Sequence, residues 1–104
     1  MLHGPRTASS GEAVAIAFRG RPLTRSFGLP TAGLSTANAG FGMSDGGVIV
    51  LTVATDVDRN GTIYGAAVEP DERASWTVAN PTDASDGAAQ AAIAWLREQP
   101  ACAG

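Results

Sequence analysis

The apolar run from Gly47 to Thr55 constrains the fold more than any other stretch of this chain. It is rich in β-branched residues, has the length of a strand and contains no proline, which predicts a β-strand. Because nearly all of its residues are apolar, we expect both faces of this strand to be covered. A chain of 104 residues has room for one domain, residues 1–104, with a sheet and about two helices.

A helix is predicted from about Ser10 to Phe18, where the hydroxylated segment Thr7–Glu12 gives way to apolar residues. Val14 and Phe18 are expected on one apolar face of this helix, with small alanines beside them that allow close approach to a sheet. The following Arg-Gly-Arg-Pro segment, residues 19–22, supplies a C-terminal glycine and a proline that would end the helix.

Ser9, at the start of this helix, has two interpretations. With Glu12 three residues later it forms a capping box, in which each side chain satisfies a backbone N–H of the helix start. Alternatively Ser9 is a nucleophile, and the N–H of Ser10 is directed at the negative charge that develops on an attacked carbonyl oxygen. The local sequence alone favours the helix cap, because capping boxes are far commoner than nucleophiles.

The segment Leu23–Phe27 alternates apolar and polar residues and predicts a short strand, closed by Gly28-Leu29-Pro30. Strand, helix and strand together then form a crossover unit. The Gly-, Ala- and Ser-rich segment Thr31–Gly46 has the composition of a flexible loop. Residues 74–79 are expected to form a short strand or an extended stretch, and residues 80–83 to introduce the last helix, from about Ala84 to Glu98. Trp95 lies on the apolar stripe of this helix and is interpreted as a packing residue.

The segment Asp56–Gly61 resembles the opening of a calcium loop, with oxygen-bearing side chains at positions one, three and five and glycine at six. The twelfth position is Ala67 instead of glutamate, and the preceding segment is a predicted strand instead of a helix. A hairpin turn, with Asn60-Gly61 providing positive φ values, is the preferred interpretation.

Four motifs, in order along most of the chain, resemble the catalytic core of the C-terminal processing, or tail-specific, peptidases. They are Thr7-Ala8-Ser9-Ser10-Gly11-Glu12-Ala13, Gly28-Leu29-Pro30-Thr31-Ala32-Gly33, Gly46-Gly47 before the apolar strand, and Val68-Glu69-Pro70-Asp71. The resemblance implies a serine nucleophile at Ser9 and half of an oxyanion hole at the Ser10 N–H. It also places Gly33, Ser35 and Asn38 beside a cleft, where they would contact an extended substrate.

The same resemblance implies an α/β fold: part of a crotonase/ClpP-like β-α superhelix core, with a β-hairpin and a C-terminal helix. The chain would be the C-terminal part of such a peptidase core, residues 1–104. The implied activity is hydrolysis of peptide bonds through an acyl-enzyme on Ser9, with a polypeptide substrate and without a metal or other cofactor. Members of the family usually work outside the cytoplasm.

The general base is where this sequence departs from the family pattern. Members of the Ser-Lys type have lysine directly after the second glycine motif, where this chain has Leu34. The chain therefore resembles the branch that uses a histidine from an upstream segment. His3 is the single histidine, and a tight Gly4-Pro5 turn could bring it back toward Ser9. The resemblance favours a loop or strand-edge role for His3 instead, because the base of the family comes from a separate upstream segment. Glu69 and Asp71 are the acids available to orient a histidine, although a turn is the simpler role for Pro70-Asp71.

Two functions follow from this. In the first, the chain is a piece of a serine peptidase, weak or inactive alone because no base activates Ser9. In the second, it is a non-catalytic binding or structural module derived from the same fold. A missing upstream domain or a homo-oligomer would complete it, since exposed strand edges favour self-association.

Charge and composition exclude other classes of function. A net charge of −3 with dispersed arginines provides no basic surface for nucleic acid. The single cysteine, Cys102, has no partner for an internal disulfide or a metal site. No run approaches the roughly 20 apolar residues that cross a bilayer, and the N-terminus lacks the pattern of a signal peptide.

Overall fold

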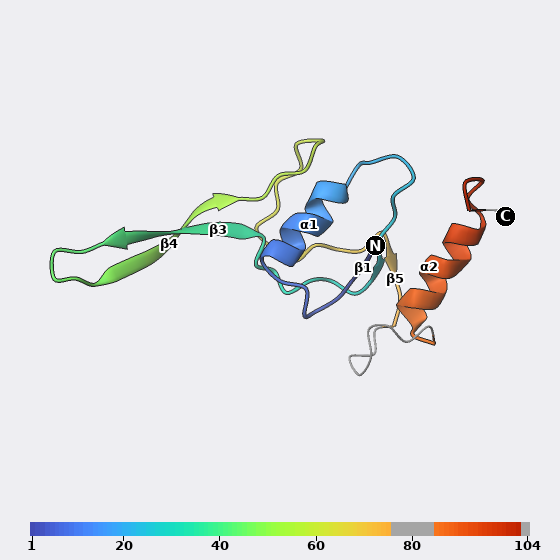
Figure 1. The fold of residues 1–104 in the computed structure, drawn as a ribbon, viewed down its shortest axis with the longest axis horizontal. Coiled ribbons are helices and arrows are strands. Elements are labelled where there is room, and N and C mark those ends of the chain that lie inside the picture. The colour runs from blue at the N-terminus through green and yellow to red at the C-terminus, as the bar shows by residue number, and fades with distance from the viewer. Residues whose placement is uncertain (76–84, 103–104) are drawn as a thin grey trace.

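The computed structural model describes residues 1–75 and 85–102 and shows an elongated α/β arrangement of about 62 × 33 × 19 Å (Figure 1). The segment 80–83, predicted to introduce the last helix, and most of the predicted strand or extended stretch at 74–79 lie outside the described residues. The elements in chain order are β1 (Leu2–His3), α1 (Ser10–Phe18), β2 (Phe27–Gly28), β3 (Thr36–Gly42), β4 (Val48–Thr55), β5 (Glu72–Arg73) and α2 (Gly87–Arg97).

A small parallel sheet with the strand order β1-β2-β5 holds the globular part together. α1 connects β1 to its parallel neighbour β2, which confirms the predicted crossover unit. The predicted strand Leu23–Phe27 is confirmed only at its last residue, because the neighbouring strands are two residues long and pair with Phe27 and Gly28 alone. Leu23 instead lies in a turn with a φ of 55°.

The apolar core is built around Phe27, the largest fully buried side chain. α2 packs across β2 and β1 and brings the Trp95 ring to 6.1 Å from that of Phe27. This contact confirms Trp95 as a packing residue on the predicted last helix. Asp86 caps the helix by accepting hydrogen bonds from the backbone N–H groups of Ala88 and Ala89.

α1 has the predicted bounds, but its predicted buried face is wrong. Val14 is 54% exposed, and Phe18 lies partly exposed against the guanidinium of Arg21. The buried face instead carries Ala15, Ile16 and a charged residue, Glu12. A carboxylate can occupy that face because the loop 31–34 donates hydrogen bonds to it.

β3 and β4 form an antiparallel hairpin that projects from the globular part (Figure 1). Two predictions are wrong here. Residues 36–42 form a strand instead of a loop, because the backbone of β4 offers them a pairing edge despite their low strand propensity. β4 has the predicted position, but all eight of its residues are exposed, so its faces are uncovered among the described residues.

The turn after β4 confirms the hairpin interpretation of residues 56–61. Val57 and Ile63 form an antiparallel bridge, and Gly61 has the expected positive φ, at 85°. The Asp58 carboxylate, which would be a ligand in a calcium loop, instead accepts hydrogen bonds from the Thr62 N–H and from the Tyr64 hydroxyl. Asn60 has no positive φ, so Gly61 alone supplies it.

Candidate active site

Ser9 precedes the first residue of α1 and is exposed to solvent. Its backbone has a φ of 51° and a ψ of −115°, a positive φ that a residue with a side chain rarely adopts. The Ser9 N–H donates to Oε2 of Glu12 at 2.8 Å. The Ser9 hydroxyl lies at the Glu12 N–H, in the position of a capping box, without completing a cap hydrogen bond of ordinary geometry. The hydroxyl is therefore only loosely engaged by its own helix.

The Ser10 N–H completes the polar surface at this helix end. Ser10 is the first residue of α1 and is exposed, and no acceptor for its N–H lies within residues 1–75 or 85–102. The first N–H groups of a helix carry a partial positive charge and have no partner inside the helix. An anionic oxygen placed beside Ser9 would therefore meet a bare donor.

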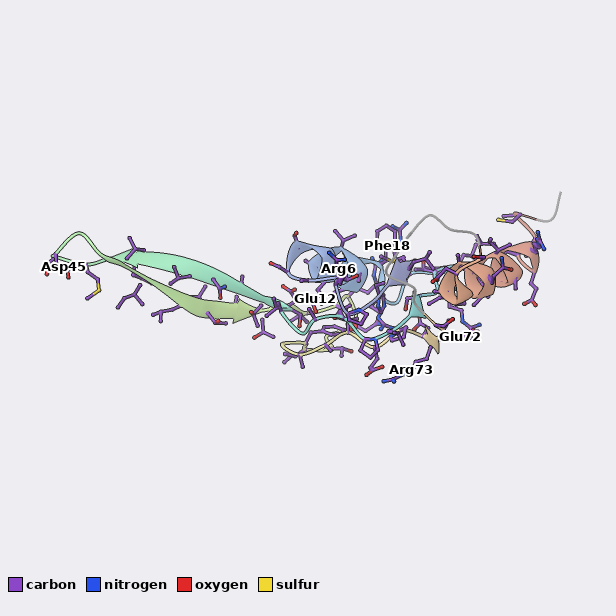
Figure 2. All side chains as sticks on the ribbon, turned by 90° about the horizontal axis from the view of Figure 1, so that it is seen from below. Arg6, Glu12, Phe18, Asp45, Glu72 and Arg73 are labelled. Carbon is purple, nitrogen blue, oxygen red and sulfur yellow. The ribbon has the colours of Figure 1, made fainter. Side chains whose placement is uncertain are left out.

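Glu12 is the residue that fixes this helix end to the rest of the chain. Its carboxylate is fully buried. Oε1 accepts the Thr31 hydroxyl at 2.5 Å and the Gly33 N–H at 2.8 Å. Oε2 accepts the Leu34 N–H at 2.8 Å in addition to that of Ser9. Figure 2 shows the Glu12 side chain on the inner side of α1. One side chain thus joins the start of α1 to the loop 31–34.

These hydrogen bonds also keep Glu12 ionised. Burial acts to raise the pKa of the Glu12 carboxyl, but the hydrogen bonds from Thr31, Gly33, Ser9 and Leu34 together outweigh it and lower the pKa below the usual value of 4.5. A buried carboxylate is tolerated when its oxygens are saturated with donors in this way. Glu12 therefore serves as a fixed acceptor and has no free lone pair with which to take the proton of Ser9.

Thr31 and Glu12 form the part of the site that the sequence interpretation missed. Thr31 is buried, and its hydroxyl also accepts the Val68 N–H at 2.8 Å. Ala32 donates its N–H to the carbonyl of Thr7, next to the serine segment. One sequence signal for this was available. Glu12 precedes Ala15 and Ile16 by three and four residues, which places its side chain on the same, buried face of the helix.

The residues predicted to contact substrate have different environments. Gly33 lies beside the site with its N–H bonded to Glu12, and its φ of 91° and close approach to Ala67 favour glycine. Asn38 is exposed on β3, where its side-chain oxygen accepts the Thr52 hydroxyl. Ser35 is fully buried, with its hydroxyl donating to the Ala66 carbonyl and accepting the Gly65 N–H. A hydroxyl held in this way has no surface to offer a substrate.

Leu34 occupies the position after the second glycine motif, and its side chain is 57% exposed. Its N–H shares Oε2 of Glu12 with the N–H of Ser9. The backbone of residue 34 therefore lies next to that of the serine, although leucine has no titratable group to use there.

His3 is not bonded to Ser9. Its ring is buried, and Nδ1 lies 3.0 Å from the Leu29 carbonyl, which requires the proton on Nδ1. Nε2 is left as a buried acceptor without a partner among the described residues. Burial is the main cause that lowers the pKa of His3, and the charges that act on it are those of Arg19, the N-terminal amine and Asp71. These groups lie at the opposite end of α1 from Ser9.

The acids of the fourth motif are also far from Ser9. Asp71 pairs with Arg19, the residue that ends α1, at 2.7 Å, and accepts both the N–H and the hydroxyl of Ser26. Ten positions along the helix separate Arg19 from Ser9, which corresponds to about 15 Å. Glu69 is exposed and pairs with Arg73. Asp71 therefore joins the end of α1 to the segment before β2.

One cavity of about 110 Å³ lies at this same end of α1. Its lining includes Met1, Phe18, Arg19, Ser26 and Asp71. Within the described residues, no three His, Cys, Asp or Glu side chains gather closely enough to hold a metal ion. No described helix has the length and apolar character needed to cross a membrane.

Comparison with known proteins gives a consistent result. The profile of peptidase family S41 matches residues 1–74. The nisin-resistance protein of Lactococcus lactis subsp. lactis is 31% identical over 94 residues, which cover 89% of this chain and 26% of that protein. A solved structure of a lipoprotein from Streptococcus agalactiae superimposes with a TM-score of 0.70 at 32% identity, over 92% of this chain and 30% of that one. The chain thus spans between a quarter and a third of these relatives.

Proposed function

The chain belongs to peptidase family S41, and from this membership we propose that it carries the nucleophile of a serine-type peptidase of the C-terminal processing kind. Ser9 is the attacking residue and the Ser10 N–H is one oxyanion donor. The observation that carries the proposal is the exposed Ser9 at the start of α1, with a positive φ and an unbonded N–H on the next residue. Such backbone conformations cluster at functional sites.

The reaction assigned to Ser9 is acyl transfer. The Ser9 oxygen bonds to the carbonyl carbon of a peptide as its proton passes to a general base, and the tetrahedral oxyanion accepts the Ser10 N–H. The carbon–nitrogen bond then breaks, the amine leaves with the proton from the base, and water hydrolyses the ester. Peptidase membership implies a polypeptide substrate.

Glu12 holds the parts of this site in place. It fixes Ser9 through its N–H and fixes the loop 31–34 through three further donors. Gly33 at the edge of that loop and Asn38 on β3 are the residues that we assign to substrate contact. The fold assignment that accompanies the proposal is the C-terminal part of a crotonase-like superhelical core.

The general base is assigned to residues that this chain does not carry. Leu34 cannot accept a proton, and the His3 ring is buried with its charged neighbours at the far end of α1. Without a base, Ser9 stays protonated near neutral pH, and loss of such a partner costs several orders of magnitude in rate. We therefore expect this chain alone to acylate slowly.

Active-site labelling tests the proposal. We expect a biotinylated fluorophosphonate to add its mass to Ser9, located by peptide mass spectrometry, and the label to disappear in Ser9→Ala. Ser10→Ala is the matched control, because it keeps the N–H assigned to the oxyanion and should label as the unaltered chain does. The peptidase proposal is overturned if Ser9 stays unlabelled both here and in a chain extended upstream with the corresponding segment of the Lactococcus relative.

The alternative function is a non-catalytic module of the same family. The observation that favours it is Leu34, exposed beside Ser9 where a lysine would act. This alternative predicts that the extended chain folds and remains unlabelled at Ser9.

A further inference from the structure

We propose that β4 pairs edge to edge with β4 of a second copy of this chain, so that two hairpins form one four-stranded antiparallel sheet. The surface concerned is the arm, defined as residues 36–55, which comprises β3, β4 and the turn between them (Figure 1).

The arm is incomplete as a folded unit. β3 and β4 form a two-stranded sheet of their own, separate from β1, β2 and β5. An isolated two-stranded ribbon is marginal in water, and three or more strands with an apolar face are needed for independent stability. Both long edges of this ribbon are unpaired within the described residues. A second copy adds two strands at once.

The apolar side chains of the arm are exposed on both of its faces. Opposed residues share a face, so Phe41 with Ile49 and Ala39 with Leu51 form one apolar face. Leu51 is 51% exposed, and on the other face Val48 and Val50 are each 66% exposed. Water-exposed strands of this composition are sites of association.

The edge of β4 fits a copy of itself better than it fits a charged partner. The arm has one ionisable side chain, Asp45, which lies in the turn at its tip, as Figure 2 shows. Natural edge strands are protected by charges, prolines or coverage, and β4 has none of these among the described residues. In an antiparallel pair related by a two-fold axis, the two Asp45 side chains lie at opposite ends and do not repel each other.

β4 is the pairing edge because β3 is the weaker strand. β3 contains Gly40 and Gly42 and no β-branched residue after Thr36, whereas β4 is mostly valine, isoleucine, leucine and threonine. Pairing through one edge of each copy also closes the assembly at two chains. An edge of eight residues is about 27 Å long and buries less than the roughly 800 Å² per partner of a standard interface. We therefore expect a dimer in the micromolar range.

The first measurement is the mass in solution. Sedimentation velocity between about 1 and about 200 µM should show the 10.5 kDa chain shifting to twice its mass as concentration rises. A chain that remains monomeric throughout overturns the proposal and indicates that another polypeptide covers the arm. Growth beyond two chains overturns it as well, because that requires the β3 edge.

Charge variants at Leu51 test the location of the contact. Leu51 lies near the middle of β4. A two-fold axis at this point places the two Leu51 side chains opposite or diagonal to each other across the contact. We expect Leu51→Lys and Leu51→Glu each to lose the dimer, by at least tenfold in dissociation constant, and an equimolar mixture of the two to recover it. A mixture that stays monomeric while the unaltered chain dimerises overturns the β4 contact.

The matched control is Ile63→Lys. Ile63 is apolar and 71% exposed but lies outside the arm, so the dimer should persist. Loss of the dimer in this variant to the same extent as in Leu51→Lys would contradict pairing through β4.

Discussion

Ser9 and Leu34 donate their backbone N–H groups to the same oxygen, Oε2 of Glu12, at 2.8 Å each. The start of α1 and the loop that follows the second glycine motif are therefore joined at one atom, although 25 positions separate the two residues in the sequence. A side chain introduced at residue 34 begins next to the serine without any rearrangement of the backbone.

The first prediction is that Leu34→Lys increases the reactivity of Ser9. A general base contributes about 10²–10⁴ in rate when it is well placed, and we expect about a tenfold or larger gain in fluorophosphonate labelling. An exposed lysine is mostly protonated at neutral pH, so the gain should grow as the pH rises towards about 10. The rate of labelling between pH 7 and pH 10 measures it.

Leu34→Arg is the control for this substitution. Arginine has a similar length and charge but does not release its proton in this range, so it should leave the labelling rate unchanged. Equal gains for lysine and arginine would show that positive charge, and not proton transfer, is responsible. Because Leu34 is largely exposed, both variants should keep the stability of the unaltered chain within about 0.5 kcal/mol.

The second prediction concerns the buried carboxylate. Glu12→Gln replaces one acceptor oxygen by an NH₂ group that faces existing donors, and leaves buried N–H groups unpaired. We expect a loss of roughly 3 kcal/mol in the free energy of unfolding, measured by urea denaturation. Thr31→Val keeps the shape but removes one donor to Glu12 and leaves the Val68 N–H unpaired. Its cost should still be smaller, because Glu12→Gln disturbs the four donors that meet at the carboxylate. A cost for Glu12→Gln below that of Thr31→Val would contradict the central role of the carboxylate.

The third prediction follows from the lowered pKa of Glu12. The folded chain holds this carboxyl ionised more strongly than the unfolded chain does, so its contribution to stability is present above a pH of about 4.5. The contribution is lost as the pH falls through the lower pKa of the folded state. The free energy of unfolding, measured as a function of pH, should therefore decrease below a pH of about 4.5 in the unaltered chain, and Glu12→Gln should lack this decrease. Parallel curves for the two proteins would disprove the assignment.

The sequence predicts those elements whose signals are local. The bounds of α1, the position of β4 and the packing of Trp95 on the last helix are confirmed because periodicity, capping and β-branched composition act within each segment. β3 could not be predicted in this way, since its glycines and alanines form a strand only through pairing with β4.

The candidate site was also predictable only where its signals are local. Ser9 and Ser10 are found at the helix start, as their motif indicates, whereas the role of Glu12 depends on donors from residues 31–34. A sequence pattern at the helix start carries no information on partners 19–22 residues away. The buried face of α1 was mispredicted for the same reason, because those donors make a charged residue acceptable inside.

The fourth prediction concerns His3. Burial lowers its pKa below the usual 6.5, so the unfolded chain takes up the proton first and stability falls as the pH drops below about 6.5. His3→Gln keeps a donor for the Leu29 carbonyl but does not titrate. We expect denaturation curves at about pH 7 and about pH 5 to differ less for this variant than for the unaltered chain. If the stability of His3→Gln depends on pH as strongly as that of the unaltered chain, groups other than His3 are responsible for the dependence.

The last prediction tests the close approach of β1 to β2 at Gly28. Its φ is 129°, and a Cβ atom built there would lie 2.0 Å from the carbonyl oxygen of His3. An alanine would force the two parallel strands apart and remove the ladder on which α2 packs. We expect Gly28→Ala to cost about 3 kcal/mol or more in the free energy of unfolding, measured by urea denaturation. Gly42→Ala is the control, because a Cβ atom there meets nothing within 4 Å and should change stability by less than about 1 kcal/mol. Equal losses of stability at the two positions would show that the close approach of β1 and β2 at Gly28 does not restrict the side chain there.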